Sequence, residues 1–177
     1  GIAGFAGKTL ANALLDSDHT LSIIGIDNLS RIGSEGNAGE LRKWGIQLVR
    51  GDVRLASDLD SLPNVDWVID CAANPSVLAG IDGQASSRQL MEHNLLGTIN
   101  LLEFCKARQA GLILLSTSRV YSATDLAALP ITEKDDQYTL QPNYLGTGIS
   151  ERGIAEGFPT TPPISLYGAS KLASEAL

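Results

Sequence analysis

Short apolar runs alternate with amphipathic segments along most of the chain. Helices are predicted where apolar side chains recur at helical spacing, over residues 6–16, 36–45, 86–108 and 164–177. Buried strands are predicted at the apolar runs 21–26, 46–49, 65–73 and 111–116. Because these strands are apolar on both faces and are separated by helices, they indicate a parallel sheet that is covered on both sides. The pattern therefore predicts an α/β fold with a doubly wound parallel sheet.

Residues 122–163 break the alternation. Proline and glycine are frequent in this segment, which is predicted to be one long insertion loop before the last helix. No strand precedes Gly1, and nothing follows the final helix. A glycine-rich turn needs a strand leading into it, so we expect residues 1–177 to be one Rossmann-type domain that is truncated at both ends. The first strand and a C-terminal substrate part are expected to be missing.

Composition narrows the function classes. The 177 residues carry a formal net charge of −7, which argues against a nucleic-acid or anionic-membrane surface. No apolar stretch approaches the roughly 20 residues that span a bilayer. The two cysteines, Cys71 and Cys105, form neither a disulfide framework nor a metal motif, and His19 and His93 lie in no metal-ligating cluster. We expect a cytoplasmic protein with no metal site.

A glycine-rich turn opens the first predicted helix, in the sequence Gly1-Ile2-Ala3-Gly4-Phe5-Ala6-Gly7. Glycines at this spacing let the backbone approach a pyrophosphate at a helix N-terminus, although a simple tight turn explains them equally well. Asp27 lies 20 residues beyond Gly7, at the end of the next strand. A carboxylate there accepts hydrogen bonds from the adenosine ribose and repels a 2′-phosphate, which favours NAD over NADP. Arg31 weakens this preference for NAD.

Two further clusters carry candidate chemistry. Asp52 and Val53 follow the strand 46–49 and are placed to flank an adenine, unless Asp52 simply caps the next helix. Tyr167 and Lys171 share one helix face, so the ammonium favours the phenolate that serves as a general base. Thr117 follows the strand 111–116, where ligands bind in doubly wound sheets, although turn chemistry also explains a threonine there.

Together these motifs resemble the extended short-chain dehydrogenase/reductases, the NAD-dependent nucleotide-sugar epimerases and dehydratases. The resemblance is carried by GxxGFxG at 1–7, IDNLSR at 26–31, GDVR at 51–54, DCAANP at 70–75, NLLGTINLLEFC at 94–105, STSRVY at 116–121 and YGASKLASE at 167–175. It implies that Thr117, Tyr167 and Lys171 form a catalytic triad. It also implies that NAD is bound by Gly1, Gly4, Phe5, Ala6, Gly7, Asp27, Asn28, Ser30, Arg31, Asp52, Val53, Ala72, Ala73 and Asn94.

One departure from the family pattern concerns the residues after Thr117. In the 4,6-dehydratases of the family, Asp and Glu follow the triad Thr, whereas Ser118 and Arg119 stand here. This difference disfavours dehydration. The Thr-Ser-Arg-Val-Tyr run and the long insertion resemble the CDP-tyvelose (CDP-paratose) 2-epimerases, which implies redox-neutral 2-epimerisation of a CDP-3,6-dideoxyhexose through a keto sugar. A UDP-sugar 4-epimerase, a nucleotide-sugar reductase and a non-catalytic NAD-binding regulator are the alternatives.

The expected partners are a CDP- or UDP-linked sugar and further copies of the chain. The helix over 86–108 is apolar on more than one stripe, more than packing on a sheet requires. With the helix that begins near Ser165 it is expected to form the interface of a homodimer or homotetramer, as in the relatives. Burial of that surface within the monomer is the competing interpretation. No nucleic acid or membrane partner is expected.

Overall fold

The computed structural model describes residues 1–81, 83, 86–141, 144, 146–150 and 152–177. Its parallel strands are β1 (Ile24–Asp27), β2 (Gln47–Arg50), β3 (Trp67–Asp70) and β4 (Gly111–Leu114). The helices associated with them are α1 (Phe5–Ser17), α2 (Ser34–Lys43), α3 (Ala56–Asp60), α4 (Ser87–Met91), α5 (Gly97–Arg108) and α7 (Leu166–Ala176). Among the described residues, no helix combines the length and the apolar character needed to cross a membrane.

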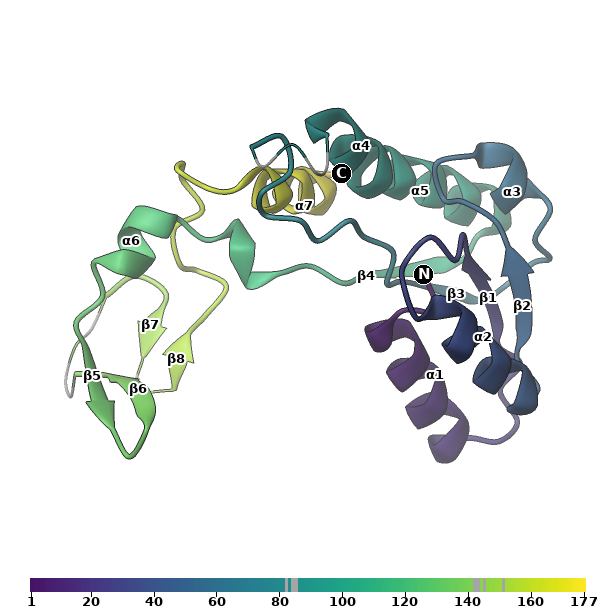
Figure 1. Ribbon diagram of the computed structural model, residues 1–177, viewed down its shortest axis with the longest axis horizontal. Helices are drawn as coiled ribbons and strands as arrows, with labels where there is room; N and C mark the ends of the chain where they lie inside the picture. The colour runs from purple at the N-terminus through teal and green to yellow at the C-terminus, as the bar shows by residue number, and fades with distance from the viewer. Residues whose placement is uncertain (82, 84–85, 142–143, 145, 151) are drawn as a thin grey trace.

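Helices cover the strands on both sides. Helices α1 and α2 lie on one side and α3 and α5 on the other (Figure 1). A hydrophobic cluster around Ala11 and Leu41 fills the first interface, and a second around Leu59, Leu101 and Phe104 fills the other. This arrangement confirms the predicted doubly wound α/β fold.

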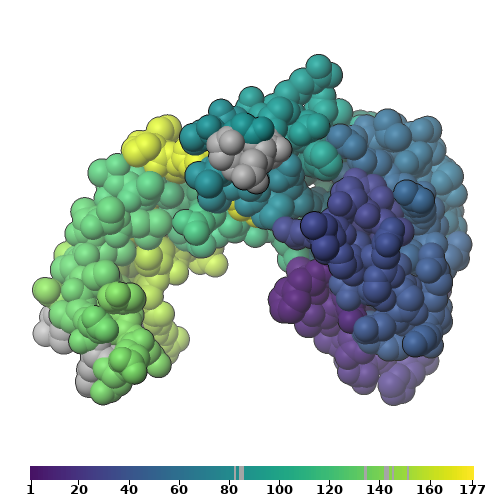
Figure 2. Space-filling view, in the orientation of Figure 1, coloured from purple at the N-terminus to yellow at the C-terminus, as the bar shows by residue number. Residues whose placement is uncertain are grey.

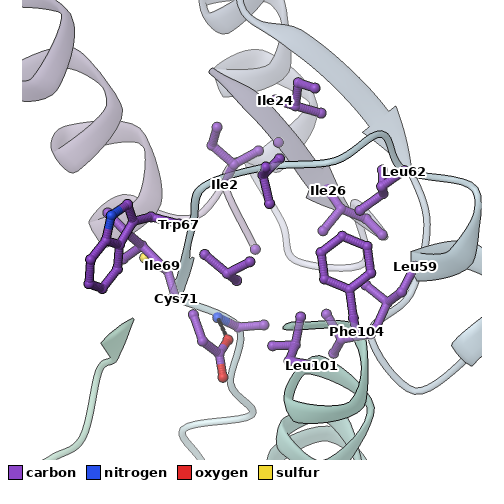
Figure 3. A pocket seen from close by; sticks show the side chains of 17 residues that line it. Ile2, Ile24, Ile26, Leu59, Leu62, Trp67, Ile69, Cys71, Leu101 and Phe104 are labelled. Atoms are coloured by element: carbon purple, nitrogen blue, oxygen red, sulfur yellow. Dashed lines mark hydrogen bonds between the residues drawn. The ribbon is translucent and has the colours of Figure 1, made fainter. Parts of the chain in front are cut away.

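The strands form two parallel pairs rather than the single sheet that the sequence predicts. β1 pairs with β2, and β3 pairs with β4. A cavity of about 120 Å³ separates the pairs and is lined by apolar side chains that include Ile24, Ile26, Ile69 and Phe104 (Figure 3). At one end of this cavity the backbone N–H of Ile2 donates a hydrogen bond to the carbonyl of Ile26 at 3.2 Å. β1 and β3 therefore face each other across this cavity without hydrogen bonds between them.

The long helix predicted over 86–108 contains a π-helical turn. α4 continues into η1 (Glu92–Leu96), a π-helix, and then into α5. Gly97, which looks like a weak point in the sequence, is a close-packing site instead. It is buried, and a Cβ at this position would lie 2.9 Å from the Val53 side chain.

The segment 122–163, expected as a loop, contains regular structure. It holds the short helix α6 (Ala123–Ala127) and two antiparallel hairpins, β5–β6 (Ile131–Lys134, Gln137–Leu140) and β7–β8 (Ile149–Ser150, Gly153–Ile154). Asp135 and Asp136 have positive φ angles of 52° and 58°, which makes the tight turn of the first hairpin. The segment extends away from the parallel strands, and the molecule is hollowed between it and the α1–α2 side (Figures 1 and 2). Pro142 lies outside the described residues.

The core on the α5 side provides a stability test. Leu59 is 1% exposed in the cluster with Leu101 and Phe104, whereas Leu55, four residues earlier, is 53% exposed. We expect Leu59→Ala to lower the free energy of unfolding by about 2–5 kcal/mol, because it leaves a cavity. Leu55→Ala should change it by less than about 0.5 kcal/mol. Urea unfolding of the intact protein measures both, and equal effects of the two variants would contradict the described core.

Candidate active site

The carboxylate of Asp27 ties the glycine-rich turn to the end of β1. It accepts hydrogen bonds from the backbone N–H of Ala3 at 2.9 Å and from that of Leu29 at 2.8 Å. A Cβ at Gly1 would lie 2.6 Å from the same carboxylate, and a Cβ at Gly7 would lie 2.6 Å from the carbonyl oxygen of Gly1. The glycines are therefore required for close backbone packing, which a simple tight turn does not need.

The first turn of α1 presents free donors. Gly4 is its N-cap and makes no side-chain hydrogen bond, and the first helical bond runs from the Lys8 N–H to the Gly4 carbonyl at 3.0 Å. The N–H groups of Phe5, Ala6 and Gly7 therefore have no intrahelical acceptor. Such a helix start stabilises an anion and is suited to a pyrophosphate.

A cavity of about 100 Å³ collects most of the predicted cofactor residues. The predicted residues that line it are Gly1, Gly4, Asp27, Asn28, Ser30, Arg31, Asp52, Val53, Ala72 and Ala73. Four others lie elsewhere. Phe5 is 84% exposed and Ala6 is exposed on α1, Gly7 is buried beneath the turn, and Asn94 is buried and bonded to Asn74.

The cavity also contains residues that the sequence analysis did not select. Besides Ile26, Ser34 and Gly51, they include Cys71 and His93. The Nδ1 atom of His93 lies 2.7 Å from the Gln89 carbonyl, which requires a proton on Nδ1 and leaves Nε2 unbonded within the described residues. His93 belongs to the π-helical turn, and helical periodicity does not predict such a turn. No sequence signal therefore placed His93 at this cavity.

Asp52 is held by several donors. Its carboxylate accepts from the Arg54 side chain at 2.9 and 2.7 Å and from the Asn28 amide at 3.0 Å. These bonds, led by the one from Arg54, hold the pKa of Asp52 far below its ordinary value of 3.8. Asp52 therefore joins the segment after β2 to the segment after β1 at the cavity edge.

Asn94 connects the segment after β3 to the last helix. Its side chain is buried, accepts from the Asn74 N–H at 2.7 Å, and donates to the Asn74 carbonyl at 3.1 Å and to the Ser170 hydroxyl at 2.9 Å. Ser170 in turn donates to the carbonyl of Tyr167 at 2.8 Å. The structure thus places Asn94 as a clamp between the loop after β3 and α7.

Helix α7 lies against the segment that leaves β4. The Ser116 hydroxyl donates to the Glu175 carboxylate, and a Cβ at Gly168 would collide with the carbonyl of Arg119. Thr117 lies between these two contacts along the chain. Gly168, Lys171 and Glu175 are spaced for one face of α7, so the Lys171 side chain starts from the face that meets the Thr117 segment. The structure therefore brings the elements that carry the predicted triad together.

Lys171 is a buried cation. Its side chain is 2% exposed, and burial lowers the pKa of its ammonium group. The carboxylates of Asp70 and Glu175 act in the opposite direction, with Asp70 the stronger of the two. Among the described residues, no group of three or more His, Cys, Asp or Glu side chains is arranged to hold a metal ion.

Comparison with known proteins assigns the family. A model of the NAD dependent epimerase/dehydratase family matches residues 1–145 of the 177. The chain belongs to this family. CDP-paratose 2-epimerase of Salmonella typhi is 31% identical over 145 residues, which cover 78% of the chain and 41% of that protein. UDP-glucuronate 4-epimerase 4 of Arabidopsis thaliana is 27% identical over 100% of the chain and 36% of its own length.

Solved structures of epimerases share the fold. The UDP-Glc/GlcNAc 4-epimerase of Campylobacter jejuni superposes with a TM-score of 0.73 at 23% identity, covering 99% of the chain and 45% of that structure. A UDP-glucuronic acid 4-epimerase of Bacillus cereus was solved in complex with NAD. It has a TM-score of 0.65 at 27% identity, and the match covers 99% of the chain and 48% of that structure. The chain thus spans less than half the length of these relatives.

The contact between Gly168 and the Arg119 carbonyl can be tested by substitution. We expect Gly168→Ala to destabilise the protein by about 1–3 kcal/mol, because the added methyl group overpacks a backbone contact. Gly39 on α2 is the matched control, since a Cβ there meets nothing within 4 Å. Gly39→Ala should stabilise by about 0.4–1 kcal/mol. Thermal and urea unfolding measure both, and a neutral Gly168→Ala variant would contradict the packing of α7.

The ion pair between Asp52 and Arg54 at the cavity edge predicts that the stability of the protein depends on pH. Because folding lowers the pKa of Asp52 below 3.8, its stabilising effect is present above that pH and is lost as the pH falls through and below it. The difference in unfolding free energy between the wild type and Asp52→Asn should therefore be largest near neutral pH and narrow in acid. Asp66→Asn, at an exposed position, is the control. A difference that does not vary with pH would argue against the pair.

Proposed function

We propose that the chain is the cofactor-binding part of an NAD-dependent nucleotide-sugar epimerase. The observation that carries this proposal is the junction of α7 with the segment after β4. There Lys171 is buried on the helix whose Glu175 binds Ser116, and the two residues after Thr117 are Ser118 and Arg119, neither of them a carboxylate. The family supports NAD as cofactor, and the relatives named above act on CDP- and UDP-linked sugars.

The residues of the 100 Å³ cavity and of the adjoining start of α1 fit NAD. The free N–H groups at the start of α1 suit a pyrophosphate, and Asp27 has acceptor capacity left for ribose hydroxyls beyond its two backbone bonds. A 2′-phosphate beside this buried carboxylate would be repelled, which favours NAD over NADP. When bound, NAD would supply the hydride transfer, first as acceptor and then as donor of the hydride of the sugar.

The protein residues would handle the proton. Tyr167, as phenolate, takes the proton of the reacting hydroxyl while the carbon loses its hydride, and Thr117 donates a hydrogen bond to the same oxygen. Lys171, as ammonium, favours the phenolate electrostatically. Tyr167 returns the proton after the keto sugar has presented its opposite face, so the sugar leaves with inverted configuration and no net redox change.

The sugar carbon that is epimerised and the identity of the substrate are proposed from the relatives. We propose 2-epimerisation of a CDP-3,6-dideoxyhexose of the paratose or tyvelose type, supported by the 31% identity to CDP-paratose 2-epimerase. A UDP-sugar 4-epimerase is the second candidate, supported by the UDP-glucuronate 4-epimerase that matches 100% of the chain. Incubation of the intact protein with CDP- and UDP-sugars, read by NMR of the products, distinguishes them. Accumulation of a 4-keto-6-deoxy sugar would instead indicate a dehydratase.

We also propose a homodimer or homotetramer. Leu96 and Ile99, next to each other on the η1–α5 surface, are each 40% exposed, which leaves apolar area for a second copy. The same helices pack against α7 within the chain through the buried pair Thr98 and Ser174. Light scattering of the intact protein and of Ile99→Glu tests the interface, since a charge there should favour the monomer.

The proposed base has a direct test. Tyr167→Phe should retain NAD affinity and lower turnover by about 10²–10⁴-fold, because the acid–base group is removed. Tyr138→Phe is the matched control, since Tyr138 is 75% exposed on the first hairpin. Unchanged turnover in Tyr167→Phe would refute the mechanism. A wild type that binds NAD but converts no sugar would favour a non-catalytic regulator, and net release of NADH would favour a dehydrogenase or reductase.

A further inference from the structure

A second cavity, of about 440 Å³, lies beside the segment after β4. Its polar lining comes from Ser118, Arg119, Tyr121 and Ser165, and the rest is apolar, with Val77 on one wall. Ser118 and Arg119 directly follow the proposed catalytic Thr117, and Ser165 is the N-cap of α7, two residues before Tyr167. The cavity is therefore lined by sequence neighbours of both Thr117 and Tyr167, the two residues of the proposed reaction centre that contact the sugar hydroxyl.

The backbone at Arg119 is held in place. Its N–H donates to the Thr117 hydroxyl at 3.2 Å within the 3-10 turn η2 (Ser118–Val120). Its carbonyl packs directly on Gly168 in the first turn of α7. The Arg119 side chain therefore starts from a point that is fixed relative to both Thr117 and α7.

Arg119 is also the one charged residue that lines this cavity within the described part of the chain. Its guanidinium makes no ion pair or side-chain hydrogen bond to a described residue. Arg119 is exposed, so its guanidinium is open to a solute, whereas those of Arg54 and Arg88 are paired with Asp52 and Glu92. In a protein of net charge −7, a free cation in a cavity creates a local site for an anion.

We propose that Arg119 binds an anionic oxygen group of the sugar nucleotide and so selects the substrate. A guanidinium presents paired N–H donors that match a phosphate or a carboxylate. Hydroxyls and apolar walls around it suit the hydroxyls and C–H faces of a sugar ring. The proposal rests on the proposed function, because it places a nucleotide sugar in this cavity. The anion is either the phosphate bonded to the sugar or a carboxylate on the ring.

The test compares substitutions at one position in the intact, NAD-loaded protein. Arg119→Gln removes the charge, Arg119→Lys keeps the charge without the paired donors, and Arg42→Gln removes an exposed arginine on α2 as a control. Isothermal titration calorimetry measures affinities for UDP, UDP-glucose and UDP-glucuronate. We expect Arg119→Gln to weaken binding by about 10- to 100-fold, as for loss of a charge-assisted hydrogen bond. The affinity of Arg119→Lys should lie between those of the wild type and Arg119→Gln. The affinity of Arg42→Gln should match that of the wild type.

The pattern of losses identifies the anion. A loss confined to UDP-glucuronate supports a ring carboxylate, and equal losses for all three ligands support the phosphate. Unchanged affinity of Arg119→Gln for every ligand, with NAD affinity retained, overturns the inference but leaves the proposed function intact. A wild type that binds NAD but neither CDP nor any of these UDP ligands contradicts both, and this result is visible before any variant is made.

Discussion

The side chain of Asn94 is the constraint on which the arrangement of the site depends. One buried amide makes three hydrogen bonds, two to the backbone of Asn74 and one to Ser170. Asn74 follows the residues after β3 that line the cofactor cavity, and Ser170 lies between Tyr167 and Lys171 on α7. Because a buried amide that loses a partner carries a large desolvation cost, the amide holds these two regions in one register.

The glycine-rich turn shows a second constraint of the same kind. Asp27 binds the N–H of Ala3, so the end of β1 and the start of α1 are one polar unit. The turn can approach the carboxylate closely only because Gly1 and Gly7 lack side chains. The first N–H groups of α1 are open to an anion because they begin the helix and have no intrahelical acceptor. Close packing and anion binding therefore meet in one turn.

In the proposed enzyme, one cavity binds NAD and the other binds the sugar nucleotide. The proposed cofactor cavity has the carboxylates of Asp27 and Asp52, and it adjoins at Gly4 the start of α1 with its free N–H groups. The second cavity has a free arginine and hydroxyls. Helix α7 borders the second cavity through Ser165 and reaches the first region through Ser170 and Asn94. A change in α7 is therefore expected to affect both cavities together.

The chain's periodicity determined which segments are helices and strands and that the sheet is covered on both faces. Apolar spacing is a local property, so α1, β1, β2, β4 and α7 were found close to their observed bounds. Motif spacing likewise selected the glycine turn, Asp27 and the Tyr167–Lys171 pair. Local patterns did not predict the two hairpins of 122–163, the first of which turns on the left-handed backbone at Asp135 and Asp136. They also did not predict the π-helical turn that places His93 at the cofactor cavity and contains the buried Asn94. The structure decided these features because they depend on particular backbone conformations, and it decided the strand pairing and the Asn94 contacts because these join segments far apart in the chain.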